Sequence, residues 1–247
     1  MIFRPSSDSD VARRPLPDVA RRPTFEMAAE VSREEVRYFI GVDLGQSHDP
    51  TAIAVVRRLR FLVSRDVQCS TPIWKEEKPT IYQCGYLERV PLGTVYPAIV
   101  AHIGRLLQRP IWSGKIDLAI DQTGVGKPVA DMFTTAGLTF TGVMITGGDS
   151  ESSEGKTWHV PKMTLVSTLQ ALLHEGRLHI QKELPEAAEL VRELQDFRVK
   201  YTEAGHLTFN AREGKHDDLV LALAIAVWRA QKQITKTQSV YIDFMSR

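Results

Sequence analysis

Three acidic segments of the chain stand where carboxylates could act together. Asp43 ends the apolar run YFIGVD, and Asp121 ends the apolar run KIDLAID. Two further acids, Asp217 and Asp218, directly precede the apolar segment LVLALAIAVW. Acids at the carboxyl ends of neighbouring strands can converge at one edge of a sheet, and an acid at a helix terminus can complete the cluster. Each acid alone is also explained by a turn or by a helix cap, which contributes about 1 kcal/mol. Together, the segments predict one acidic site.

Such a site predicts bound cations. Two carboxylates about 4 Å apart repel each other by roughly 1 kcal/mol in water and roughly 4 kcal/mol at an effective dielectric of 20. A divalent cation removes this repulsion, and all-oxygen ligands suit Mg²⁺ or Mn²⁺. Two such ions can activate a water and stabilise the leaving oxygen of a phosphodiester. We therefore expect Asp43, Asp121 and the pair Asp217 and Asp218 to be metal-binding and catalytic. Adjacent helical residues point about 100° apart, so the sequence leaves open which member of the pair faces the metals.

The segment IDQTGVGKPVADMF first suggests a nucleotide-binding loop, because glycines precede Lys127. A P-loop, G-x-x-x-x-G-K-[ST], needs a glycine five places before its second glycine and a hydroxyl after its lysine. Those positions hold Asp121 and Pro128, and proline also lacks the N–H that would bind phosphate. Nucleoside triphosphate binding is therefore not predicted. Gly124 and Gly126 are interpreted as a tight exit from a strand into a helix, and Lys127 as a solvated surface lysine.

Several cations lie beside the acidic segments and could contact a phosphate or DNA. Lys162 is near the start of a predicted helix, and Lys215 and His216 directly precede the last acids. His216 could also bind metal or assist a leaving group, although a histidine beside a helix usually does neither. In the predicted hairpin FRVKYTEAGHLTFN, alternation places Arg198 and Lys200 on one face, where they could contact DNA backbone. A solvated edge hairpin is an equally good interpretation.

Composition narrows the class of protein. The chain has 247 residues, of which 43% are hydrophobic, enough for a sizeable core. A net charge of +1 excludes a uniformly basic surface but allows a local basic groove. No apolar run approaches the roughly 18 residues of a membrane helix, and no secretion signal is present, so we expect a protein of the cytoplasm. Cys69 and Cys84 lack metal-site spacing and are expected to be reduced.

The order of elements predicts an α/β fold with a mixed central sheet flanked by helices. Residues 1–36, which contain DVARRP twice, are expected to be a disordered Pro/Arg-rich tail, residues 37–232 one domain, and residues 233–247 a second tail. A long loop or insertion is expected at 61–80, a polar Gly/Ser loop before the helix at 161–174, and a parallel crossover from the strand at 115–121 to that at 140–146. The remaining predicted strands are 38–43, 51–58, 81–90, a short one over RLHI, and the hairpin 197–210; the remaining predicted helices are 95–108, 125–136, 185–195 and 217–231.

Four motifs in this order resemble the C-terminal nuclease domain of phage large terminase subunits, which has the ribonuclease H-like fold. They are GVDLGQSHDPTAIAVV, IDQTGVGKPVADMF, VPKMTLVSTLQALLHEGRLHI and GKHDDLVLALAIAVW. The resemblance covers about residues 38–231. In that family, acids on the first strand, at the end of a later strand and at the last helix bind two divalent metals. These positions match Asp43, Asp121 and the pair Asp217 and Asp218.

The resemblance implies a metal-dependent DNA endonuclease that uses two Mg²⁺ or Mn²⁺ ions. Its substrate would be concatemeric viral double-stranded DNA, cut during packaging into a capsid in the host cytoplasm. Large terminases also carry an N-terminal packaging ATPase, whereas this sequence has no Walker motif. Either the chain is an isolated nuclease domain, or the ATPase is a separate chain that would join DNA, a small terminase subunit and a portal among the partners.

Three alternatives remain open. A Holliday-junction resolvase-like nuclease shares this fold and would cut branched DNA. A sugar-kinase or chaperone-type ATPase begins with a similar G-x-D-x-G strand, here GVDLG, but needs two copies of the core. A non-catalytic DNA-binding or assembly subunit would keep only a relic of the site, and acids in all three motifs argue against that interpretation.

Overall fold

A computed structural model describes residues 31–45, 49–64, 74–112, 115–196, 198–201, 207–210 and 216–245. Besides the strands and α-helices given next, these residues contain one 3₁₀ turn, at Pro110–Trp112. The strands and α-helices are, in chain order, β1 (Val31–Asp43), β2 (Ala52–Ser64), β3 (Lys75–Arg89), α1 (Tyr96–Leu107), β4 (Ile116–Asp121), α2 (Gly126–Thr135), β5 (Thr141–Thr146), β6 (Ser152–Glu154), β7 (Thr157–Pro161), α3 (Lys162–His174), β8 (Leu178–Ile180), α4 (Ala187–Asp196), β9 (Arg198–Tyr201), β10 (Leu207–Asn210) and α5 (Asp218–Met245).

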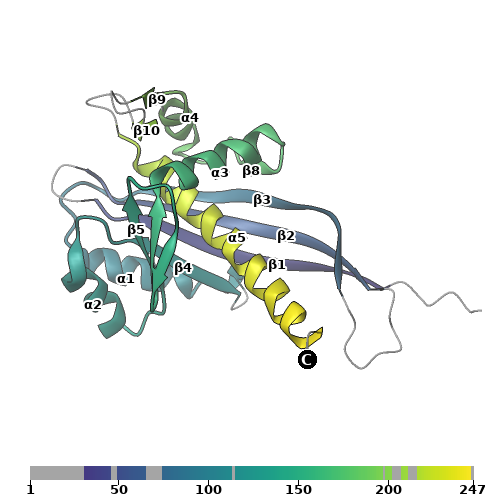
Figure 1. Ribbon diagram of the computed structural model, residues 1–247. Coiled ribbons are helices and arrows are strands. Elements are labelled where there is room, and N and C mark those ends of the chain that lie inside the picture. Colours follow the sequence, from purple (N-terminus) through teal and green to yellow (C-terminus); the bar gives the residue numbers. More distant parts are fainter. Residues whose placement is uncertain are drawn as a thin grey trace, which may run out of the picture.

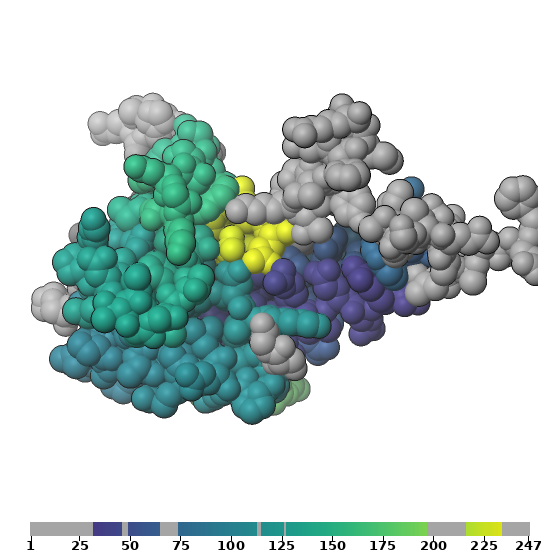
Figure 2. Space-filling model, turned by 90° about the horizontal axis from the view of Figure 1, so that it is seen from below, coloured from purple at the N-terminus to yellow at the C-terminus, as the bar shows by residue number. Residues whose placement is uncertain are grey.

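Eight of the strands form one mixed sheet in the order β6-β7-β5-β4-β1-β2-β3-β8. β1, β2 and β3 make an antiparallel meander, and β4 lies parallel to β1 on its other side. β5 continues the parallel part, so the predicted crossover through α2 is confirmed. Helices α3 and α5 cover one face of the sheet and α1 and α2 the other (Figure 1). The outer halves of β1 to β3 extend beyond α1 and α2, and β1 is the purple surface to one side in Figure 2.

The alternation of side chains along β1 determines which face each residue occupies. Phe39 is buried in the core under α3 and α5, whereas Ile40 and Val42 are buried in the core under α1 and α2. On β4, Ala119 belongs to the first core and Ile120 to the second. Because successive residues alternate, the acids that end both strands belong to the α5 face.

Helix α5 packs directly on β1. Its residues from Asp218 to Ala230 are almost all buried, which explains why the sequence LVLALAIAVW has no polar stripe. Small side chains let the backbones approach closely: a Cβ at Gly41 would lie 2.0 Å from the carbonyl oxygen of Ala222 and 2.6 Å from the backbone nitrogen of Ala226. The position of α5 over the sheet is therefore fixed by a glycine on the central strand.

The structure confirms the predicted fold class and most elements but corrects several boundaries. The loop predicted at 61–80 is wrong where β2 continues to Ser64 and β3 begins at Lys75. Charged residues beyond the predicted strands pair across the sheet: Arg60 donates to Glu76 at 2.7 Å and lies 3.6 Å from Glu35. The sequence of one strand taken alone therefore shows no alternation of apolar and polar residues in this region, because its charged side chains are paired with acids on the neighbouring strands.

Other predicted limits also shift. β1 begins at Val31, inside the predicted N-terminal tail, and α5 runs to Met245, inside the predicted C-terminal tail. The expected Gly/Ser loop contains β6, which pairs antiparallel with β7 directly after the loop. β9 and β10 form the predicted hairpin. Residues 1–30, Cys69 and the hairpin turn at 203–205 lie outside the described residues.

Two expectations about composition can also be compared with the structure. Cys84 is a free, buried thiol, and burial raises its pKa from 9.0 to about 12. Over the part of the chain that the structure describes, no helix combines the length and hydropathy needed to cross a membrane.

Candidate active site

A cavity of about 420 Å³ lies where β1 and β4 end and α5 begins. Six of the residues singled out in the sequence line it, although they are up to 175 positions apart: Asp43, Asp121, Lys162, His216, Asp217 and Asp218. The remaining lining residues are Leu44, Gly45, Asp49, Thr123, Ile145 and Leu221. The three acidic segments therefore meet, as the sequence predicted.

Asp43 and Asp121 end adjacent parallel strands. Val42 lies opposite Ile120 in the sheet, so the next residue of each strand reaches the same edge and the same face. The two carboxyl groups are close enough that each one affects the pKa of the other. Burial, then the neighbouring carboxylates with Asp121 foremost, raises the pKa of Asp43 well above its usual value.

Asp121 is held in place by the turn that follows it. Burial raises its pKa, and hydrogen bonds from Thr123 oppose that rise. The backbone N–H of Thr123 donates to Asp121 Oδ1 at 2.8 Å, and Thr123 Oγ1 accepts from the backbone N–H of Ile145 at 2.7 Å. Gly124 has φ of 81°, a left-handed conformation that favours glycine. The glycine after the acid therefore serves the tight exit from β4, as predicted from the sequence.

Asp218 is the first residue of α5 and is only 5% exposed. Its Oδ2 has no hydrogen-bond partner. The nearest basic groups among the described residues are Arg89 Nη2 at 3.8 Å and His216 Nδ1 at 3.9 Å. Burial raises the pKa of Asp218 to about 6, and the positive charges of Arg89 and His216 act against that rise. A buried carboxylate oxygen without a donor, facing other carboxylates, is suited to a cation.

Asp217 has a different environment from its neighbour. It is half-buried, and its Oδ2 lies 2.7 Å from Lys162 Nζ in an ion pair. Lys162 begins α3, so this pair joins the starts of two helices at the edge of the cavity. Both Asp217 and Asp218 line the cavity, but of the two only Asp218 has a buried carboxylate oxygen without a hydrogen-bond partner.

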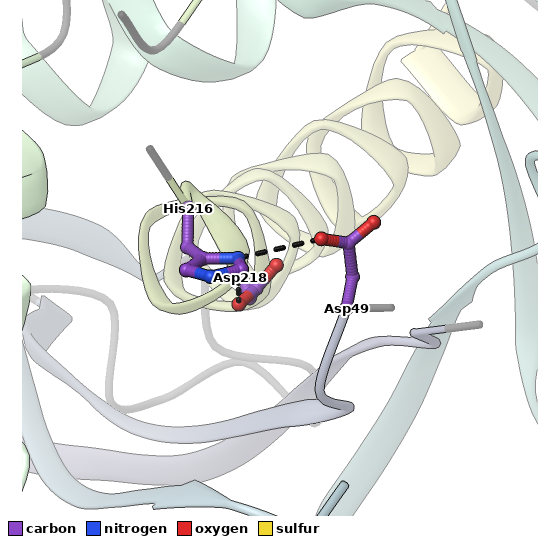
Figure 3. Close-up of side chains that lie close together, drawn as sticks. All are labelled: Asp49, His216 and Asp218. Carbon is purple, nitrogen blue, oxygen red and sulfur yellow. Dashed lines mark ion pairs between the residues drawn. The ribbon is translucent and has the colours of Figure 1, made fainter. Parts of the chain in front are cut away.

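Asp49 is a site residue that the sequence analysis missed. His216 Nδ1 lies 3.3 Å from Asp49 Oδ1, and one ligand atom each from Asp49, His216 and Asp218 lie within 4.8 Å of one another (Figure 3). The signal was present but weak: Asp49 lies in the loop that leads from Asp43 into β2, so it returns to the same edge of the sheet. An Asp-Pro pair in such a loop is ordinarily explained as a turn.

The acids belong to two overlapping sets. Asp43 and Asp121 interact with each other, and the charge of Asp218 also acts on Asp43. Asp218 is at the same time a member of the set with Asp49 and His216. The first set offers only carboxylate oxygens, which suit Mg²⁺ or Mn²⁺. The second set adds the imidazole of His216 to two carboxylates, and this combination suits Mn²⁺. The residues present therefore fit divalent cations.

The other residues that the sequence suggested for phosphate or DNA contact are not among the described residues that line the cavity. Lys127 is exposed on α2, in agreement with its interpretation as a surface lysine. Arg198 and Lys200 lie on β9, but their side chains are outside the described part of the structure, as is Lys215 altogether. Their predicted role in phosphate or DNA contact stays a prediction.

Comparison with known proteins identifies similar solved structures. No family model and no curated protein matches the sequence. The large terminase nuclease from thermophilic phage G20c is 22% identical, with 78% of this chain and 81% of that chain covered and a TM-score of 0.51. The structure of that nuclease with bound magnesium is 23% identical at the same coverage, with a TM-score of 0.52. The Thermus phage P74-26 large terminase nuclease domain is 21% identical over 77% of this chain and 78% of that chain, with a TM-score of 0.50.

These matches define the fold. The chain has an α/β ribonuclease H-like fold, with a mixed sheet flanked by helices. More particularly, it has the fold of large terminase nuclease domains, so the resemblance that the four motifs indicated is confirmed at the level of the fold.

Proposed function

We propose that this chain is a metal-dependent DNA endonuclease that cleaves concatemeric viral double-stranded DNA during genome packaging. The observation that carries the proposal is the meeting of Asp43, Asp121 and Asp218 from three separate elements in one cavity, with a buried oxygen of Asp218 lacking a hydrogen-bond donor. The fold shared with terminase nucleases supports the same activity, and one of those nucleases was solved with bound magnesium.

Each residue of the cavity has a role in this proposal. Asp43, Asp121 and Asp218 would hold the ions, with Asp49 and His216 completing the ligand set around Asp218. Two divalent cations supply an activated water and charge stabilisation for the leaving oxygen of a phosphodiester. Thr123 fixes the orientation of Asp121 through its backbone N–H.

Lys162 would provide a positive charge for the DNA phosphate at the edge of the cavity. Its Nζ is held by Asp217 at 2.7 Å, which sets the place of the ammonium group before DNA arrives. Asp217 is then a residue that positions a lysine, and Asp218 is the metal ligand. This division of roles is the choice that the sequence left open.

The biological setting is part of the same proposal. The substrate is double-stranded DNA in the host cytoplasm, and the partners are a packaging ATPase, a small terminase subunit and a portal. The catalytic unit corresponds to the predicted domain of residues 37–232. A kinase-like ATPase would need a second copy of the core, whereas the described residues contain one large sheet and one hairpin.

The test is cleavage of linear duplex DNA with Mn²⁺ or Mg²⁺ by the full chain. Asp43→Asn and Asp121→Asn should each lower the cleavage rate by at least about 100-fold, because a metal ligand contributes at least as much as the outer residues that support it. Asp131→Asn makes the same chemical change on the exposed face of α2, away from the cavity, and should cleave like the wild-type chain.

A second substrate distinguishes related nucleases. A four-way junction of matched sequence should be cut no faster than the duplex. Strong preference for the junction would contradict the proposed packaging nuclease and would instead support a Holliday-junction resolvase. Wild-type cleavage by both Asp43→Asn and Asp121→Asn would show that the cavity is not the active site.

A further inference from the structure

Helix α4 contacts the first turn of α5 through a buried acid that does not line the cavity. Glu193 is 4% exposed. Its Oε2 accepts a hydrogen bond from the backbone N–H of Val220 at 3.0 Å, and its Oε1 accepts one from Arg89. Both oxygens of Glu193 are therefore engaged by donors from two other elements, the start of α5 and the end of β3.

The bond to Val220 replaces a missing helix cap. The carbonyl oxygen of Asp217 accepts from the backbone N–H of Leu221 at 2.9 Å, which puts Asp217 in the N-cap position. An N-cap aspartate ordinarily accepts from the N–H two or three places further on. Here the Asp217 carboxylate is bound to Lys162, and Glu193 supplies the acceptor for Val220 from another helix.

Arg89 connects this acid to the metal site. It ends β3, where it pairs with Ala52 in the sheet, and its side chain is 20% exposed. One guanidinium nitrogen, Nη2, bonds Glu193 and lies 3.8 Å from Asp218 Oδ2. The separation is too long for a hydrogen bond, so Arg89 attracts the carboxylate while Asp218 Oδ2 keeps no hydrogen-bond donor.

We propose that Glu193 and Arg89 are positioning residues that fix the first turn of α5 and the carboxylate of Asp218 for a divalent cation. The inference deepens the proposed function and rests on it. Glu193 acts by capping Val220 and by holding the guanidinium, and Arg89 acts by its charge beside Asp218. Neither side chain lines the cavity. Their effect reaches the cation only through Asp218.

The inference is tested by Mn²⁺ binding to the full chain in the absence of DNA, measured by isothermal titration calorimetry. Glu193→Ala should weaken Mn²⁺ binding by about 10- to 100-fold, the range for residues that support metal ligands. Glu193→Gln keeps one acceptor oxygen for the Val220 N–H and should lose clearly less. If Glu193 were itself a ligand, Gln would be as damaging as Ala, and the inference would be wrong.

A packing control separates positioning from general damage to α4. Leu190 is fully buried on the same helix, three residues before Glu193. Leu190→Ala should lower the melting temperature but leave Mn²⁺ affinity within about threefold, because it removes no polar contact to α5. Equal loss of Mn²⁺ affinity in Leu190→Ala and Glu193→Ala would overturn the inference, as would wild-type affinity in Glu193→Ala.

Mn²⁺ affinity and DNA cleavage are measured separately, so failure of the positioning role can be distinguished from failure of the proposed nuclease activity. A wild-type chain that binds Mn²⁺ but cuts no DNA would contradict the nuclease alone, and the Glu193 variants would still be decided by calorimetry. A chain that cuts DNA with unchanged Mn²⁺ affinity in Glu193→Ala would contradict the positioning role alone. Absence of Mn²⁺ binding by the wild-type chain would overturn the inference.

Discussion

At the residue scale, the neighbours Asp217 and Asp218 show how one helix start can supply two different functions. Asp217 is half-buried and neutralised by Lys162, whereas Asp218 is buried with an oxygen that no donor satisfies. An ion pair at the edge of a cavity is partly screened by water and contributes modestly. A buried carboxylate without a donor is unfavourable until a cation binds it. The two acids should therefore respond differently to the same substitution.

Asp218→Asn should lower the rate of Mn²⁺-dependent DNA cleavage by at least about 100-fold, because it removes a charged metal ligand. Asp217→Asn should lower it by less than about tenfold, because the amide oxygen can still accept from Lys162. Both are measured as initial rates on one linear duplex at saturating Mn²⁺. Equal and mild effects would remove α5 from the mechanism, and the reverse order would exchange the roles of the two acids.

At the element scale, the site depends on how closely α5 approaches β1. Asp43 ends β1 and Asp218 starts α5, so the distance between these elements determines whether their carboxylates share a cavity. Gly41 is the point of closest approach, with the backbone of Ala222 and Ala226 above it. Backbone atoms of a packed helix cannot move aside as a flexible side chain can. Gly41 therefore allows α5 to pack close to β1, and this close packing sets the distance between the carboxylates of Asp43 and Asp218.

Gly41→Ala should destabilise the chain by about 3 kcal/mol or more, at or above the upper end of the range for overpacked cores. Gly85→Ala is the matched control on β3, because a Cβ there meets only the Gln181 side chain at 3.8 Å. The control should change stability by less than about 1 kcal/mol. Chemical denaturation of both variants measures the difference. Wild-type stability of Gly41→Ala would mean that α5 does not contact β1 as described.

The sequence predicted those elements whose patterns are local. The apolar runs that end in Asp43 and Asp121 predicted strands β1 and β4. Because both strands end at the same edge of the sheet, their last residues predicted the acidic cluster. The outer halves of β1 to β3 could not be predicted, because charged residues such as Arg60 are paired with acids on the two neighbouring strands. Asp49 was missed for a related reason. Its place beside His216 depends on a loop and a helix start that are far apart in the chain.

At the scale of the whole molecule, the clustered carboxylates of the cavity oppose folding when no cation neutralises them. Carboxylates from β1, β4 and α5 are brought together, and burial with mutual repulsion raises the pKa of Asp43 and Asp218. Residues that impose such repulsion on the folded state are commonly kept for activity at the expense of stability. Divalent cations that bind the folded chain should reverse the penalty by mass action. In the proposed function, metal binding and folding of the whole chain are therefore coupled.

Mn²⁺ at about 100 times its dissociation constant should stabilise the wild-type chain by about 2.7 kcal/mol, which corresponds to a rise in melting temperature of about 5–10 °C for a domain of this size. Asp43→Asn should lose most of this rise, because a ligand is missing. In EDTA the same variant should melt above the wild-type chain, since one repelling carboxylate is gone. Asp131→Asn, exposed on α2, should follow the wild-type chain in both conditions. Differential scanning calorimetry measures all three proteins, and an unchanged Mn²⁺ response in Asp43→Asn would show that the carboxylate at the end of β1 does not hold the ion.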